Sequence, residues 1–218
     1  MKIKILSELS AIEYVSGNIP PTCIISITNQ GKNNIPFKNQ NIIEILHVKF
    51  ADSLYQGRMT EDNARSIIEF LIKNQNAENF MVHCKAGQSR SAAVGAVMMG
   101  LFNNDESPVW NNPYMLPNRW CYYFLKLQIK MRLQNIEKTT NPFNIKNMQK
   151  LNYNDEYMYW CYINMPQYTG YGLILEPNDE TSIRLNDGLY GTGFSVKVKK
   201  IKKNQLFLLP PIKRRDNY

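Results

Sequence analysis

The segment from Val82 to Ser91 constrains this chain more than any other. It runs Val-His-Cys-Lys-Ala-Gly-Gln-Ser-Arg-Ser and places Cys84 and Arg90 at the two ends of a short loop. Residues 79–82 before it, Asn-Phe-Met-Val, predict a short buried strand, and the small and apolar residues 91–101 after it predict a buried helix. The loop should therefore join the end of a strand to the start of a helix.

A loop at the start of a helix is suited to bind an anion. The first backbone N–H groups of a helix have no partner within it, and the helix dipole adds partial positive charge there. The same surroundings favour a thiolate, since the pKa of cysteine falls from about 8.5 to about 3.5–7.5 in an electropositive site. Arg90 adds a permanently charged fork of donors that fits two phosphate oxygens. We therefore predict a phosphate-binding loop with Cys84 as an ionised nucleophile.

At these positions the chain resembles the cysteine-dependent phosphatases, whose signature is His-Cys, five residues, Arg, then Ser or Thr. His83, Cys84, Arg90 and Ser91 match its four fixed positions. Gly87 and the strand-loop-helix context argue against the alternative, a buried cysteine near an unrelated surface arginine. The resemblance is closest to the compact dual-specificity-like phosphatases of bacteria and their viruses.

The resemblance covers roughly residues 1 to 138. Residues 24–28 are similar to the family's first core strand, and residues 43–50 to the strand before its acid-bearing loop. Residues 118–122 are similar to the segment in which a Pro-Asn-Arg element leads into another helix. Beyond residue 138 the chain resembles no family known to us.

The resemblance also implies roles for the residues of the loop. Cys84 would attack phosphorus in line, while Arg90 and the loop amides would hold the phosphoryl oxygens. Ser91 would donate a hydrogen bond to the sulfur or cap the helix, and the two roles are compatible. His83 would order the loop rather than act as a base, because the thiol is already ionised. The remaining phosphate-binding residues would be Lys85, Ala86, Gly87, Gln88 and Ser89.

A carboxylic acid on a facing loop protonates the leaving group in this family. Asp52 is the candidate, because it follows a predicted strand and precedes Cys84 by about the family's usual interval. It would then act as a base toward water. A solvated aspartate or a helix cap is the alternative for Asp52, and Ala51 stands where relatives often carry a second acid. Asp62 is the fallback, although its place in a first helical turn favours an electrostatic role.

The substrate is less constrained than the chemistry. A phosphorylated protein is the expected substrate, modified on tyrosine with or without serine and threonine. Lys85 is shared with inositol-lipid phosphatases, but Gln88 replaces their usual second lysine. RNA 5′-triphosphatases share the loop plan, yet no RNA-reading motif accompanies it. A phospho-binding module without turnover is the non-enzymatic alternative. No metal or organic cofactor is expected.

The sequence predicts an α/β phosphatase domain at residues 1–144. Strands over 22–28, 42–50 and 79–82 alternate with helices that begin near residues 60, 91 and 120, and a strand and a short helix are expected within 3–15. Alternation of this kind favours a mostly parallel central sheet flanked by helices, with the loop at the carboxyl end of a central strand. The segment 103–117, which holds three prolines, is predicted to be a long loop.

Residues 145–218 are predicted to form a connector and a small β-rich accessory region. Tyrosine and glycine recur from residue 153, Trp160 lies among the tyrosines, and residues 194–199 alternate with period two. The region also holds a basic run, for which a solvated edge strand and a docking surface for nucleic acid or another acidic partner are both open. The net charge of +8 fits an acidic partner without identifying it. The run consists of Lys197, Lys199, Lys200, Lys202, Lys203, Lys213, Arg214 and Arg215.

The composition predicts a cytoplasmic location. The four cysteines at 23, 84, 121 and 161 are far apart and lack metal-ligand spacing, which favours a reducing compartment. No apolar stretch reaches the roughly 18 residues that a membrane span needs. The first residues also lack the long apolar region of a signal peptide.

Overall fold

A computed structural model places the chain in two compact units, Met1–Gln128 and Ile129–Tyr218. The structure describes residues 1–53, 57–138, 157–165, 168–179, 182–186, 194–197, 206–209 and 212–213. The predicted domain boundary at residue 144 and most of the basic run lie outside these ranges, and both stay predictions.

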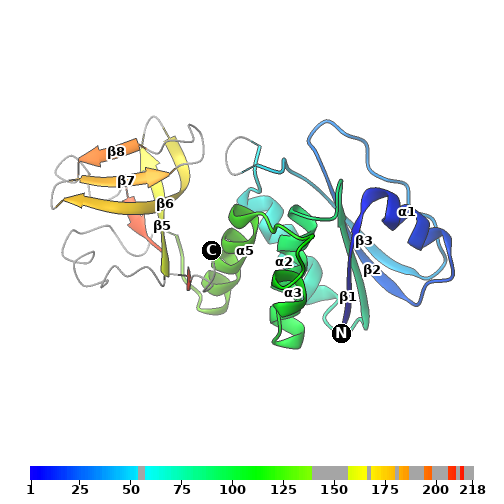
Figure 1. The fold of residues 1–218 in the computed structure, drawn as a ribbon. Coiled ribbons are helices and arrows are strands. Elements are labelled where there is room, and N and C mark those ends of the chain that lie inside the picture. The colour runs from blue at the N-terminus through cyan, green and yellow to red at the C-terminus, as the bar shows by residue number, and fades with distance from the viewer. Residues whose placement is uncertain are drawn as a thin grey trace. The chain divides into compact units, whose positions relative to one another are not determined.

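The first unit is built on a four-stranded sheet in which all strands are parallel (Figure 1). Its order is β1 (Lys2–Ser7), β4 (Asn79–Cys84), β2 (Thr22–Thr28) and β3 (Ile42–Lys49). Every residue of β2 is buried, as expected for a β-branched strand that is covered on both faces. The predicted α/β class with a largely parallel sheet is confirmed.

Helices cover both faces of this sheet, with α1 (Glu8–Ser16) on one and α2 (Glu61–Lys73) and α3 (Arg90–Asn103) on the other (Figure 1). The strands contribute side chains to both faces of the sheet because successive side chains point in opposite directions. In β4, Met81 packs with Ala11 of α1, whereas the ring of Phe80 contacts Phe70 of α2 and Phe102 of α3. None of the helices in the described ranges is long and apolar enough to cross a membrane.

Helix α2 begins where the sequence predicts. The Thr60 side chain accepts a hydrogen bond from the Asn63 backbone N–H at 3.3 Å, and the Asn63 side chain accepts one from the Thr60 backbone N–H at 3.1 Å. This reciprocal cap satisfies two donors that the helix itself leaves unpaired. Glu61 and Asp62 follow in the first turn, where the helix dipole favours negative charge.

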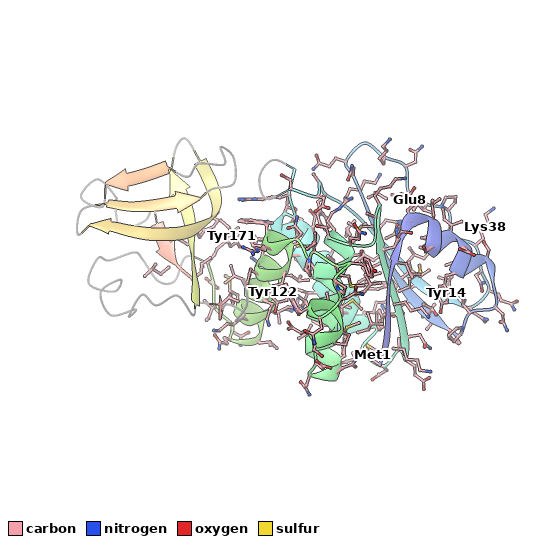
Figure 2. All side chains as sticks on the ribbon, in the orientation of Figure 1. Met1, Glu8, Tyr14, Lys38, Tyr122 and Tyr171 are labelled. Atoms are coloured by element: carbon pink, nitrogen blue, oxygen red, sulfur yellow. The ribbon has the colours of Figure 1, made fainter. Side chains whose placement is uncertain are left out.

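The predicted long loop at 103–117 is interrupted by a short helix, α4 (Ser107–Trp110). The expectation was wrong because proline was read as a helix breaker, whereas Pro108 lies in the first turn, where its fixed φ is compatible with a helix. Glu106 ties α4 to α5 (Arg119–Leu133) by accepting hydrogen bonds from Trp110 Nε1 at 3.3 Å and Tyr122 Oη at 2.5 Å. Figure 2 shows Tyr122 on α5.

The second unit contains an antiparallel sheet, so the predicted β-rich character of this region is confirmed. Strand β5 (Tyr157–Met165) pairs with β6 (Tyr168–Asp179), β9 (Leu206–Leu208) and β10 (Ile212–Lys213). Strand β7 (Ser182–Asn186) lies between β6 and β8 (Phe194–Lys197). Buried residues of this sheet include Cys161, Tyr171, Phe207 and Leu208.

Truncation of Ile25 should destabilise the first unit far more than truncation of Ile43. Ile25 is fully buried in the interior strand β2, whereas Ile43 in the edge strand β3 is 52% exposed. Ile25→Ala should lower the free energy of unfolding by about 2–5 kcal/mol, because it removes buried methyl groups and leaves a cavity. Ile43→Ala should lower it by less than about 1 kcal/mol. Urea unfolding of the two variants measures both values, and equal losses would contradict the placement of β2.

Candidate active site

The candidate active site is the loop between β4 and α3. Strand β4 ends at Cys84 and α3 begins at Arg90. Between them, Gly87 has a φ of 78°, and a Cβ atom there would lie 2.6 Å from the backbone nitrogen of Ser7. Only glycine tolerates both the positive φ and this close approach. The end of β1 therefore supports the loop directly.

Cys84 is a buried thiol in surroundings that stabilise its charge. Burial is the largest single influence and by itself raises the pKa. Opposing it, the Ser91 hydroxyl lies 3.1 Å from the sulfur, the backbone N–H groups of Ser91 and Gly87 donate to it, and the positive charge of Arg90 is nearby. Together these interactions hold the pKa of Cys84 below its ordinary value. A sulfur of this kind can act as a thiolate nucleophile.

Two other buried cysteines show the opposite shift. Burial raises the pKa of Cys23 to about 11, with a further contribution from Glu44. Burial also raises the pKa of Cys121. Both thiols stay protonated near neutral pH, so the donors around Cys84, rather than burial, account for the lowered pKa of its thiol.

Arg90 is only 4% exposed and joins the loop to the ends of two other strands. Its Nη1 donates to the Phe50 carbonyl oxygen and to Asn29 Oδ1, both at 2.7 Å. These residues directly follow β3 and β2. Its buried Nε finds no acceptor within the described part of the chain. Because a buried N–H without an acceptor is unfavourable, a bound phosphate oxygen is a suitable partner for this atom.

The structure also brings Asp52 to the loop. One carboxylate oxygen of Asp52, Oδ1, accepts hydrogen bonds from Ser89 Oγ at 2.7 Å and from Asn118 Nδ2 at 2.9 Å. The fallback residue Asp62 instead forms an ion pair with Arg65 on the exposed surface of α2, and its side chain is 83% exposed. Of the two carboxylates, Asp52 is the one that contacts the loop between β4 and α3.

His83 lies within the sheet next to the loop. Its Nε2 is 2.9 Å from Ser26 Oγ, and its ring makes an edge contact with the ring of Phe37. Burial lowers the pKa of His83 to about 4, so the imidazole is neutral near pH 7. As the neighbour of Cys84 in a strand, it points to the opposite face of the sheet. This contact with β2 agrees with a role in ordering the loop.

Ser91 does not cap helix α3. The helix begins at Arg90, which makes Ser89 its N-cap residue. The Ser89 side chain donates to Asp52 and makes no cap hydrogen bond. Ser91 lies inside the first turn, where its hydroxyl is engaged with the sulfur of Cys84.

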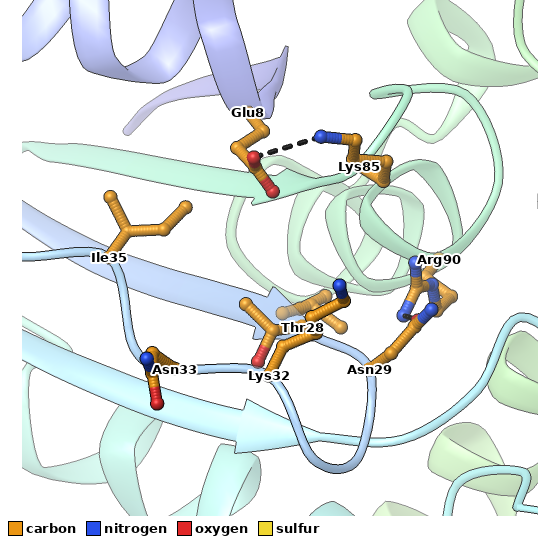
Figure 3. Close-up of a pocket in the computed structure, with 9 residues that line it drawn as sticks. Glu8, Thr28, Asn29, Lys32, Asn33, Ile35, Lys85 and Arg90 are labelled. Carbon is orange, nitrogen blue, oxygen red and sulfur yellow. Dashed lines mark hydrogen bonds and ion pairs between the residues drawn. The ribbon is translucent and has the colours of Figure 1, made fainter.

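A pocket of about 410 Å³ opens beside the loop (Figure 3). Lys85 lines this pocket and makes two contacts with Glu8 of α1. Lys85 Nζ lies 3.0 Å from Glu8 Oε1, and the Glu8 backbone N–H donates to the Lys85 carbonyl oxygen at 3.3 Å. Glu8 therefore balances the charge of the first loop residue and fixes its backbone. The other lining residues are Ile27, Thr28, Asn29, Lys32, Asn33, Ile35 and Arg90.

The sequence alone assigns no role to Glu8, Asn29 or Asn118. A signal for the first two exists, because each directly follows a strand of the parallel sheet, and the carboxyl ends of such strands meet at one edge. Asn118 precedes a predicted helix, but its contact with Asp52 spans 66 residues and has no local signal.

The donors around Cys84 suit a tetrahedral oxyanion. The loop amides, the start of α3 and the Arg90 Nε, which has no acceptor among the described residues, all present N–H groups or positive charge. Across the described ranges, no group of three or more His, Cys, Asp or Glu side chains could hold a metal ion.

Comparison with known proteins finds similarity in structure only. No protein-family model and no curated protein match the sequence. Among solved structures, the chain is similar to PTPMT1 in complex with PI(5)P, with 16% identity and a TM-score of 0.43 over 62% of this chain and 95% of that one. Human DUSP28 shares 17% identity with a TM-score of 0.42 and the same coverage. Human tyrosine phosphatase-like serine/threonine/tyrosine-interacting protein shares 24%, with a TM-score of 0.38 over 51% of this chain and 78% of that one.

These matches fall among the dual-specificity and protein tyrosine phosphatases, the class whose signature the loop resembles. Identities of this order concern the fold alone. The chemistry has to be inferred from the residues of the site.

Titration of Cys84 should show a thiolate at a pH where an ordinary thiol is protonated. Ultraviolet absorbance of the thiolate, with Cys84→Ser as the blank, should give a midpoint below about 8.5. In Ser91→Ala the midpoint should move to higher pH, because the hydroxyl that lies 3.1 Å from the sulfur is lost. A wild-type midpoint at or above that of free cysteine would contradict the electrostatic description of the site.

Proposed function

We propose that this protein hydrolyses phosphate monoesters of proteins through a covalent phosphocysteine on Cys84. The supporting observation is a thiol of lowered pKa that shares one loop with a buried guanidinium whose Nε has no acceptor in the described residues. A nucleophile and an anion-binding group are then carried by the same loop. This is the combination that phosphoryl transfer to sulfur requires.

In the first step, the Cys84 thiolate attacks phosphorus in line with the leaving oxygen. A sulfur–phosphorus bond forms as the phosphorus–oxygen bond breaks. Arg90 and the loop amides stabilise the charge on the three equatorial oxygens. Asp52 donates its proton to the leaving oxygen, so the product leaves as an alcohol or phenol.

In the second step, water attacks the phosphocysteine. Asp52, now a carboxylate, accepts a proton from the water as a phosphorus–oxygen bond forms. The sulfur–phosphorus bond breaks, which releases inorganic phosphate and regenerates the thiolate. The Ser91 hydroxyl, 3.1 Å from the sulfur, stabilises the negative charge that returns to it.

A phosphorylated protein is favoured over substrates with several phosphates by the charges near the loop. Gln88 occupies the position where inositol-lipid phosphatases carry a second lysine. Lys85 is already paired with Glu8 at 3.0 Å. Its charge is therefore balanced within the protein. This argues against Lys85 as the group that binds a second phosphate of an inositol lipid or of an RNA 5′-triphosphate.

Cys84→Ser should abolish turnover of an aryl phosphate while inorganic phosphate still binds. A serine hydroxyl is not ionised in this site, so the nucleophile is lost and the anion-binding groups remain. Release of the phenol and calorimetric titration with phosphate measure the two properties. Cys23→Ala, which removes a buried thiol of raised pKa, should retain turnover. Activity in Cys84→Ser would contradict the proposal, and a wild type that binds phosphopeptides yet hydrolyses none would indicate a binding module instead.

Asp52→Asn should lower kcat by about 10²–10⁴-fold and remove the alkaline limb of the pH–rate profile, because it removes the acid. Asp62→Asn is the matched control, since Asp62 lies on the exposed surface of α2. It should change kcat little. The reverse pattern would assign the proton transfer to Asp62.

A further inference from the structure

The Asn118 side chain links the candidate acid to the start of α5. It is only 8% exposed. Its Nδ2 donates to Asp52 Oδ1 at 2.9 Å and lies 3.5 Å from the Ser53 carbonyl oxygen. Its Oδ1 accepts from the Cys121 backbone N–H at 2.9 Å. Both polar ends of this buried amide are therefore occupied, which fixes its orientation.

The backbone around Asn118 is fixed to the phosphate loop. The Asn118 N–H donates to the Ser89 carbonyl oxygen at 3.2 Å, and the Leu116 N–H donates to the Gln88 carbonyl oxygen at 2.9 Å. The Asn118 carbonyl oxygen accepts from the Tyr122 N–H at 3.0 Å in the first turn of α5. These backbone hydrogen bonds to the loop fix the position from which the Asn118 amide contacts Asp52.

Asp52 depends on partners outside its own segment. It lies two residues beyond Phe50 on the connector after β3, and its side chain is exposed. The donors from Ser89 and Asn118 both reach Oδ1. In a protonated carboxyl group the carbonyl oxygen is the better acceptor, so two donors at Oδ1 direct the proton to Oδ2.

We propose that Asn118 is a positioning residue that orients Asp52 as the general acid of the reaction proposed above. It holds one carboxylate oxygen against the loop and leaves the other to carry the proton toward the leaving group. The inference rests on the proposed function, but it concerns only how the acid is held.

The leaving group of the substrate separates this role from a general structural one. The ratio kcat/KM covers the steps up to formation of the phosphocysteine, in which acid catalysis matters most when the leaving alcohol is weakly acidic. Asn118→Ala should therefore lower kcat/KM by about 10–100-fold for phenyl phosphate, as expected for a displaced catalytic group. For 4-nitrophenyl phosphate, whose leaving group is far more acidic, the loss should be several-fold smaller.

A second variant tests whether the effect of Asn118→Ala arises from loss of the fold. Asn118→Asp keeps an oxygen that can accept from the Cys121 N–H at the start of α5 but removes the donor to Asp52. It should show the same dependence on the leaving group. Asn74→Ala is the matched control, because Asn74 also donates to a carboxylate, Glu44 Oε2 at 2.9 Å, but at the opposite end of the sheet. Its kcat/KM should equal that of the wild type for both substrates.

A double-mutant cycle completes the test. If Asn118 acts through Asp52, then Asn118→Ala should lower kcat/KM no further in an Asp52→Asn background. Additive losses, or an equal loss for both substrates, would overturn the inference and make Asn118 a structural support of the loop. If Asp52→Asn alone has no effect, the acid assignment itself fails. If turnover is independent of Cys84, the proposed function fails.

Discussion

The rest of the site is arranged around the buried Arg90 guanidinium and the Cys84 thiol, which lie at the two ends of one loop. A buried charge is strongly unfavourable unless an opposite charge or hydrogen bonds compensate for it. Arg90 is 4% exposed, and its neutral acceptors, the Phe50 carbonyl oxygen and Asn29 Oδ1, satisfy only part of it. The Ser91 hydroxyl and the backbone N–H groups of Ser91 and Gly87 lower the pKa of the Cys84 thiol, and the charge of Arg90 adds to their effect. A thiolate at Cys84 would in turn offset the buried charge of Arg90.

The positions of Arg90, Cys84 and the acceptors of Arg90 depend on the whole sheet. The arginine begins α3, its acceptors follow β2 and β3, and the thiol ends β4. A parallel sheet brings these ends to one edge without any special local sequence. The support for the loop comes from β1, whose last residue lies against Gly87. Asp52 joins the same assembly through its hydrogen bonds with Ser89 and Asn118.

Local patterns predicted the parts of this structure that depend on neighbours in sequence. The helix start at Thr60, the buried strand β2 and the strand-loop-helix around Cys84 are all features of short segments. Helix α4 was missed because proline serves both to break helices and to begin them. The contacts of Asn118 and Glu8 could not be predicted, since they join residues 66 and 77 positions apart and follow from packing rather than from spacing.

The pairing of β1 with β4 also bears on how the site is formed. Lys2 is in register with Asn79 and Ser7 with Cys84. The first strand of the chain therefore pairs with a strand that lies far from it in the sequence. The entropy of closing a loop of that length opposes the pairing until it is made, and contacts of high sequence separation slow folding. Helices such as α2 can form from local contacts, but the contact between the end of β1 and Gly87 cannot. The support that β1 gives to the loop at Gly87 therefore depends on a long-range contact rather than on the secondary structure around it.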